Sequence, residues 1–112
     1  MPPDSFVAGQ THAFLGQAYA GLGQAASAIA EGQKAVAIHS TSKDPADGPV
    51  EEESLARVYA LLGETDHAIP ILKRLLQIPH SGAITPALLR LDPVWDQIRN
   101  DPRFQKLASA TP

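Results

Sequence analysis

Large apolar residues recur every three or four positions in two stretches of the chain, the spacing that places them on one face of an α-helix. The first stripe is formed by Phe14, Leu15, Ala18, Tyr19 and Leu22, and the second by Leu55, Val58, Tyr59 and Leu62. A glycine follows each stripe, Gly23 or Gly63, and glycine readily adopts the left-handed conformation that ends a helix. The pattern therefore predicts two helices, each closed by a tight turn.

A further apolar stripe with helical spacing begins after each glycine. It comprises Ala25, Ala28, Ile29, Ala35, Val36 and Ile38 in the first half, and Ala68, Ile69, Leu72, Leu75 and Leu76 in the second. Each half is thus predicted to form an antiparallel helical hairpin, over residues 5–39 and 50–79. Thr65 or Asp66 is expected to cap the last of these helices. Pro70 is expected to introduce a tolerated kink, because it forfeits one backbone hydrogen bond.

The two halves are related by sequence. Residues 15–29 (LGQAYAGLGQAASAI) align without a gap to residues 55–69 (LARVYALLGETDHAI), with seven identities in fifteen positions. A unit of this size usually buries its apolar face only by stacking on another copy, so the repeat sets the architecture. The offset of forty residues includes residues 40–49 (STSKDPADGP), a polar stretch with proline and glycine that predicts a loop.

The repeated residues resemble the signature of the tetratricopeptide repeats, which runs L-G-x2-Y, then alanine, then a large apolar residue, then proline. The matching positions are Leu15, Gly16, Tyr19 and Ala28 in the first copy and Leu55, Ala56, Tyr59, Ala68 and Leu72 in the second, with Pro79 near the closing proline. The resemblance implies an all-α fold of tetratricopeptide-like antiparallel hairpins, an α-α superhelix. Gly32 departs from the signature, because it stands where the large apolar residue belongs. We therefore expect looser packing in the first copy, or another segment that fills the gap.

Three short helices are predicted in the C-terminal part of the chain, each starting with a capping residue followed by proline. The start signals are Thr85-Pro86, Asp92-Pro93 and Asp101-Pro102, and the expected helices cover residues 86–91, 93–99 and 102–108. A solenoid needs an atypical element over its last hairpin, so residues 83–108, with Trp95 and Phe104, are predicted to form a cap. This segment also resembles the C-terminal end of tetratricopeptide arrays in bacterial multidomain signalling proteins, which implies that the chain is part of a longer polypeptide.

Composition narrows the class of protein. Of the 112 residues 44% are apolar, enough for one modest core, so residues 1–112 are predicted to form a single domain. The 9 basic and 12 acidic residues are mixed along the chain without a basic stripe, which argues against nucleic acid as a partner. The sequence contains no cysteine, no apolar run of about 18 residues and no export signal. These absences favour a cytoplasmic protein that does not cross a membrane.

No pattern of catalytic or metal-ligating residues stands out. The four histidines are His12, His39, His67 and His80. They fall on separate predicted elements, and none forms the paired arrangement of a metalloprotease helix. The acidic run at residues 51–53 opens a predicted helix, where the helix dipole favours carboxylates. The sequence therefore predicts no enzyme, no cofactor and no metal site, with a small hydrolase or metal enzyme as a formal alternative.

The resemblance also implies where a partner would bind, because the first helix of each tetratricopeptide hairpin lines a concave groove. The positions that would face it are Gln10, Ala13, Gln17 and Ala20 in the first copy and Val50, Glu53, Arg57 and Ala60 in the second. Polar side chains beside small alanines leave room for an extended peptide or a helix. The lysines and asparagines with which one subclass binds chaperone tails are not matched, so that activity is not carried over.

The expected function is therefore the binding of a protein or peptide partner through this groove. The alternative is a structural role. About three repeats are normally needed for a stable array, so the exposed flank of the first copy would pack on a further repeat or on a second copy of the chain. The latter arrangement predicts a homodimer.

Overall fold

All the secondary structure in the described part of the chain is helical, which confirms the predicted all-α class. The computed structural model describes residues 4–38, 48–77 and 84–109, and their side chains from residue 10 in the first range and residue 51 in the second. The helices are α1 (Asp4–Gly21), α2 (Ala25–Ile38), α3 (Gly48–Leu61), α4 (Thr65–Leu76), α5 (Pro86–Leu91), the 3-10 helix η1 (Pro93–Ile98) and α6 (Pro102–Ser109). Most of the loop predicted at residues 40–49, and Pro79, lie outside the described residues.

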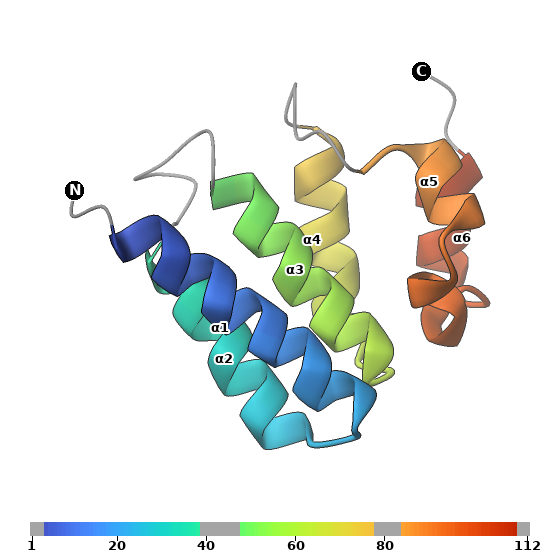
Figure 1. Ribbon diagram of the computed structural model, residues 1–112. Coiled ribbons are helices and arrows are strands. Elements are labelled where there is room, and N and C mark those ends of the chain that lie inside the picture. Colours follow the sequence, from blue (N-terminus) through green and yellow to red (C-terminus); the bar gives the residue numbers. More distant parts are fainter. Residues whose placement is uncertain (1–3, 39–47, 78–83, 110–112) are drawn as a thin grey trace.

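Helix α3 is the central element of the molecule. α1 and α2 form one antiparallel pair and α3 and α4 a second, and α5, η1 and α6 follow beside the second pair (Figure 1). α3 contacts α1 and α2 as well as α4 and η1. The hairpins are thus neighbours in space, and the second is covered by the first on one side and by the C-terminal segment on the other. The molecule measures 40 × 32 × 19 Å along its principal axes.

Both hairpins are closed by the same turn. Gly23 and Gly63 have positive φ angles of 76° and 73°, in the left-handed region that glycine adopts without steric cost. The amide of Gln24 donates to the carbonyl of Tyr19 at 2.9 Å, and the amide of Glu64 donates to the carbonyl of Tyr59 at 2.8 Å. Each of these bonds closes a six-residue loop. Inside each loop the amide of the glycine donates a second hydrogen bond to the carbonyl three residues before it. The two bonds together form the Schellman motif. The two turns predicted from the glycines are therefore confirmed.

The start of α4 differs from the prediction. Glu64 is the N-cap and its side chain makes no capping hydrogen bond, whereas Thr65 is already the first helical residue. The expected cap at Thr65 or Asp66 is therefore wrong. The reason is the preceding turn: it leaves the carbonyl of Glu64 in place to accept the amide of Ala68 at 3.1 Å, which begins the helix directly after the turn. The helix then continues through the exposed Pro70 to Leu76.

The start signals of the C-terminal segment correspond to real caps. Thr85 Oγ1 accepts the amide of Leu88 at 3.1 Å, and Asp92 Oδ1 accepts the amide of Val94 at 3.0 Å. Asp101 Oδ1 accepts the amide of Arg103 at 2.8 Å. The three expected helices begin where the sequence places them, although the second is a 3-10 helix that ends at residue 98 and the third extends to residue 109.

Arg99 holds the C-terminal segment together. Its guanidinium donates to the carbonyls of Leu89 at 2.9 Å, Arg90 at 2.8 Å and Asp92 at 2.8 Å. These carbonyls lie at or beyond the end of α5, where they have no partner within the helix. The guanidinium also lies 5.8 Å from the ring centroid of Phe104. One side chain thus connects the end of α5 to η1 and α6.

The largest fully buried side chains belong to the second hairpin and the C-terminal segment. They are Trp95, Phe104, Leu72, Leu75, Leu89, Ile98 and Val58. Trp95 and Phe104 pack with ring centroids 6.4 Å apart, and both join Leu72 and Leu75 in the main core cluster. The C-terminal segment therefore covers the second hairpin with the aromatic residues that the sequence analysis assigned to it.

The first hairpin packs through small residues, and the predicted core stripe of α1 is wrong. Phe14 and Leu22 are 67% and 72% exposed, Leu15 is 40% exposed, and Ala18 is also exposed. Among residues 10–21 of α1, the buried ones are instead Ala13, Gly16 and Ala20. A Cβ atom on Gly16 would lie only 3.2 Å from backbone atoms of Ala28 and Gly32. The helices approach too closely there for large side chains, so α1 turns its small residues inward.

Leu55 occupies the space that Gly32 leaves. A Cβ atom on Gly32 would lie 2.7 Å from Leu55 Cδ1, and Gly32 itself is buried. Of the two consequences expected from this glycine, the filling of the gap by another segment is the one observed, since α3 supplies the missing apolar volume. At the equivalent position of the second hairpin, Leu72 fills its own site and is fully buried.

Candidate partner-binding pocket

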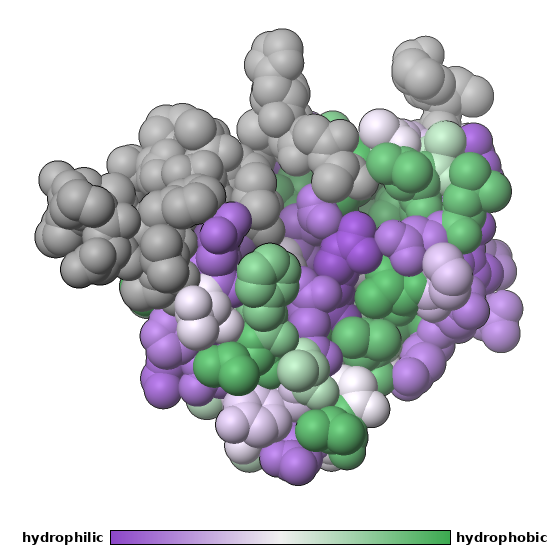
Figure 2. All heavy atoms as spheres, in the orientation of Figure 1, coloured by the Kyte–Doolittle hydropathy of each residue, from purple (hydrophilic) through white to green (hydrophobic). Residues whose placement is uncertain are grey.

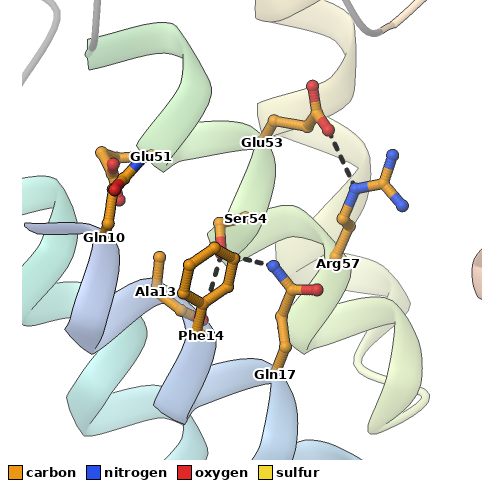
Figure 3. A pocket seen from close by; sticks show the side chains of 8 residues that line it. All are labelled: Gln10, Ala13, Phe14, Gln17, Glu51, Glu53, Ser54 and Arg57. Atoms are coloured by element: carbon orange, nitrogen blue, oxygen red, sulfur yellow. Dashed lines mark hydrogen bonds and ion pairs between the residues drawn. The ribbon is translucent and has the colours of Figure 1, made fainter.

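A pocket lies between α1 and α3, the first helices of the two hairpins (Figure 3). Its volume is about 210 Å³. The lining residues are Gln10, Ala13, Phe14 and Gln17 from α1 and Glu51, Glu53, Ser54 and Arg57 from α3. The structure thus brings together around one pocket the five residues Gln10, Ala13, Gln17, Glu53 and Arg57 that the sequence analysis assigned to a groove. We call this site the α1–α3 pocket.

Two further groove candidates do not face it. Ala20 and Ala60 are buried in the core, where Ala20 packs with Ala28 and Val58, and Ala60 belongs to the main cluster. Their assignment to the groove is therefore wrong, because neighbouring helices cover both side chains. The side chain of Val50 lies outside the described residues. The pocket consequently lies along residues 10–17 of α1 and residues 51–57 of α3.

Three lining residues were missed by the sequence analysis. Phe14 was assigned to the core, whereas its ring is exposed and stands at the pocket in Figure 3. Ser54 and Glu51 are buried polar residues on the same helix as Glu53 and Arg57. A signal for Ser54 was present, because it lies one turn before residue 57 on the face that the groove assignment had already selected. The same signal existed for Phe14, which lies one turn after Gln10 and one turn before Gln17, but its apolar side chain was assigned to the core.

A short polar network fixes the base of the pocket. Gln17 Nε2 donates to Ser54 Oγ at 2.8 Å, and Ser54 Oγ donates to the carbonyl of Ala13 at 3.4 Å. These bonds join α1 to α3 directly. Because Ser54 is buried, its hydroxyl needs such partners, and the pair stabilises the relative position of the two helices. Gln17 thus has a structural bond in addition to its place in the lining.

Arg57 is held by carboxylates on two elements. Its Nε donates to Glu53 Oε2 at 2.9 Å, and its Nη1 donates to Asp92 Oδ2 at 3.0 Å. The guanidinium lies 5.3 Å from the ring centroid of Trp95, a cation–π distance. The side chains of Arg57 and Glu53 are only 20% and 13% exposed. Arg57 therefore links α3 to η1 at the edge of the pocket.

The same contacts perturb the titration of Asp92. The amide of Val94, with help from the guanidinium of Arg57, holds the pKa of the Asp92 carboxyl below its usual value of 3.8. A hydrogen bond or a positive charge beside a carboxylate stabilises its ionised form, which is the cause of this direction. Asp92 is therefore ionised at neutral pH and balances the charge of Arg57.

Other polar clusters of the described residues have structural partners. His12 Nδ1 forms a short contact with Glu31 Oε2 that joins α1 to α2, and this hydrogen bond lowers the pKa of Glu31. The ring of His67 stacks on that of Tyr59, with centroids 5.0 Å apart. Within the described ranges, no three histidine, aspartate or glutamate side chains are grouped so as to hold a metal ion. His39 and His80 lie outside these ranges.

The acidic run at the start of α3 is more than a helix-dipole feature. Glu51 and Glu52 are only 3% and 7% exposed. Glu52 forms an ion pair with Arg74 of α4, and Glu51 lines the α1–α3 pocket. Burial of a carboxylate is costly unless a partner compensates its charge, and Arg74 does so for Glu52. Glu52 thus joins α3 to α4, whereas Glu51 adds to the polarity of the pocket lining.

Comparisons with protein-family models, with curated proteins and with solved structures each found no match. Among the helices of the described segments, none combines the length and the apolar character needed to span a membrane.

Proposed function

We propose that the chain is a protein- or peptide-binding module of the tetratricopeptide type, which binds its partner in the α1–α3 pocket and does not catalyse a reaction. The observation that carries the proposal is this pocket, which is lined by equivalent helices of two related hairpins. The residues Gln17 and Arg57, at equivalent positions of the two copies, both line it.

The dimensions and chemistry of the pocket support a peptide ligand. Its volume of about 210 Å³ is below the roughly 300 to 1,000 Å³ of typical small-molecule sites. This size suits one or two side chains of a larger ligand. The exposed ring of Phe14 offers an apolar wall, and aromatic residues are frequent among those that dominate binding energy.

Several local features support the tetratricopeptide assignment. The two helices of each pair are antiparallel, and the first of them ends in a Schellman turn. The second helix of each pair packs through a fully buried alanine, Ala28 or Ala68. Tyr59 of the signature is buried in the core, and its counterpart Tyr19 is half-buried. The C-terminal segment covers the last hairpin, as a cap at the end of an array does.

The proposal is tested by selecting binders from a randomised peptide library against the purified chain. Phe14→Ala is expected to weaken the binding of the selected peptides by about tenfold or more, as loss of an aromatic contact in an interface commonly does. Leu22→Ala is the matched control, because Leu22, in the turn directly after α1, is similarly exposed and does not line the pocket. A failure to select peptides, or an equal effect of both substitutions, would contradict the proposal.

A second function is favoured by exposed apolar side chains of the first hairpin outside the pocket. Leu15 and Leu22 are exposed and do not line the α1–α3 pocket, and within the described residues the first hairpin packs against α3. We propose as the alternative that these side chains pack on a further repeat or on a second copy of the chain. Sedimentation equilibrium separates the two functions. An obligate dimer that dissociates on Leu22→Ser substitution would favour the structural role, and a folded monomer that binds peptides would favour the binding module.

A further inference from the structure

We infer that Asp92 is a positioning residue of the α1–α3 pocket: through its bond to Arg57, the C-terminal segment sets the affinity of the pocket for its peptide. The inference rests on the proposed function of this pocket as a peptide-binding site, and it adds a contact from outside the lining that regulates binding there. It is carried by the contacts of Arg57, by the anchoring of Asp92 and by the exposure of the pair.

Two elements together determine the conformation of Arg57 at the edge of the pocket. Its Nε donates to Glu53 Oε2 at 2.9 Å, the bond that a dashed line marks in Figure 3. Both residues belong to α3 and stand four positions apart, and such a pair within one helix stabilises only weakly. Its Nη1 donates to Asp92 Oδ2 at 3.0 Å. This second bond fixes the far end of the guanidinium from another part of the chain.

Asp92 is itself held in place by the C-terminal segment. As the N-cap of η1 it accepts the amide of Val94 on Oδ1 at 3.0 Å, and its carbonyl accepts Nη2 of Arg99 at 2.8 Å. The two carboxylate oxygens thus have separate roles, one in the cap and one on Arg57. Trp95, which the core buries to 1% exposure, lies 5.3 Å from the same guanidinium. Docking of η1 therefore places Asp92 against Arg57.

The ion pair lies where a ligand can reach it. The side chains of Arg57 and Asp92 are 20% and 31% exposed, and Arg57 lines the pocket. Figure 2 shows hydrophilic side chains gathered over α3 in the middle of this face of the molecule. An arginine side chain without fixed partners adopts many rotamers, and a ligand that packs on it loses affinity because it must order that side chain. Asp92 orders Arg57 before the ligand binds.

The experiment measures the affinity of peptides selected against the original chain, by isothermal titration calorimetry at neutral pH. Asparagine is a good N-cap, so Asp92→Asn preserves the start of η1, and circular dichroism checks the fold. Asparagine has one acceptor oxygen where the carboxylate uses two, so it cannot also hold Arg57 in the same way. We expect the affinity to fall about three- to tenfold, the effect of ordering one long side chain on binding.

The matched control is Asp101→Asn, in the same segment. Asp101 Oδ1 accepts the amide of Arg103 at 2.8 Å, and Asp101 Oδ2 accepts Arg103 Nη2 at 3.0 Å. The control therefore removes the same kind of ion pair at the same kind of cap and changes the net charge equally. Neither Asp101 nor Arg103 lines the pocket, so the affinity for the peptides should equal that of the original chain.

A double-mutant cycle distinguishes positioning from a general effect on stability. In an Arg57→Gln chain, Asp92→Asn should cause no further loss of affinity, because the contact through which Asp92 acts is already absent. The inference would be overturned by an unchanged affinity in Asp92→Asn, by an equal loss in Asp101→Asn, or by the same loss in the Arg57→Gln chain as in the original one.

The outcome also separates this inference from the proposed function. If the affinity of the selected peptides falls with Phe14→Ala but not with Asp92→Asn, the pocket binds peptides and the positioning role of Asp92 is wrong. If no peptides are selected whose binding depends on Phe14, both the inference and the proposed function are overturned.

Discussion

The contact between Gly32 and Leu55 allows a quantitative test of how the two hairpins pack. In a Gly32→Ala variant the new Cβ atom would lie 2.7 Å from Leu55 Cδ1, closer than nonbonded carbon atoms approach. Overpacking costs about 1 to 3 kcal/mol, and the lower end applies here because Leu55 Cδ1 is the end of a flexible, half-buried side chain. Alanine is also a better helix former than glycine, by about 1 kcal/mol. The expected net result is a loss of at most about 1 kcal/mol in the free energy of unfolding.

Leu55→Ala should destabilise the chain by about 2 kcal/mol, near the lower end for leucine because this side chain is half-buried. In the double variant, the methyl group at residue 32 would occupy part of the space that Leu55 vacates. We therefore expect a loss well below the sum of the single losses, with a favourable coupling of about 1 kcal/mol or more.

The assay is urea unfolding followed by far-ultraviolet circular dichroism, with the denaturant dependence checked to be equal among the variants. Gly21→Ala is the control for helix propensity, because nothing lies within 4 Å of its Cβ position. It should leave the free energy of unfolding equal or raise it by up to about 1 kcal/mol. Additive losses in the double variant, or stabilisation by Gly32→Ala as large as that by Gly21→Ala, would refute the interlocked packing.

Two further predictions concern the C-terminal segment. Arg99→Lys should lower the free energy of unfolding, measured in thermal melts, by about 1 to 2 kcal/mol. The reason is that an ammonium group cannot reproduce the bonds to the carbonyls of Leu89, Arg90 and Asp92. Full retention of stability would contradict this role of Arg99. The lowered pKa of Asp92 predicts a contribution to stability that is present above the unfolded-state value near 3.8 and lost as the pH falls through the lower folded-state pKa. Asp92→Asn should therefore be less sensitive to acid than the original chain when unfolding is compared at neutral and acidic pH, and equal sensitivity would exclude this contribution.

Local features of the fold could be predicted from the sequence because their causes are local. The positive φ angles of Gly23 and Gly63 and the caps at Thr85, Asp92 and Asp101 depend on residues within one helical turn. Each of these features is set by steric limits or by one hydrogen bond to a nearby amide. The pattern of residue types is then sufficient to locate the ends of the helices.

The rotation of α1 could not be predicted in the same way. Its large apolar residues mark one face, yet Gly16 and Ala20 mark another at equally regular spacing. Which face is buried depends on how closely α2 and α3 approach, and therefore on Gly32 and Leu55 far along the chain. The same uncertainty extended to the site. Gln17 and Arg57 were assigned to the groove through the resemblance to tetratricopeptide repeats, whereas Phe14 was assigned to the core.

The division of the pocket between α1 and α3 has a consequence for the energetics of any ligand. One wall belongs to a hairpin with an alanine- and glycine-rich interior, and the other to a hairpin with large buried side chains. Local opening of the first hairpin would separate the walls, so a ligand that contacts both binds only the closed form. Binding therefore lowers the population of the open form, and the amide hydrogens of α1 and α2 exchange more slowly when the ligand is present. A ligand would in this way add rigidity to the first hairpin, whose interior consists of small side chains.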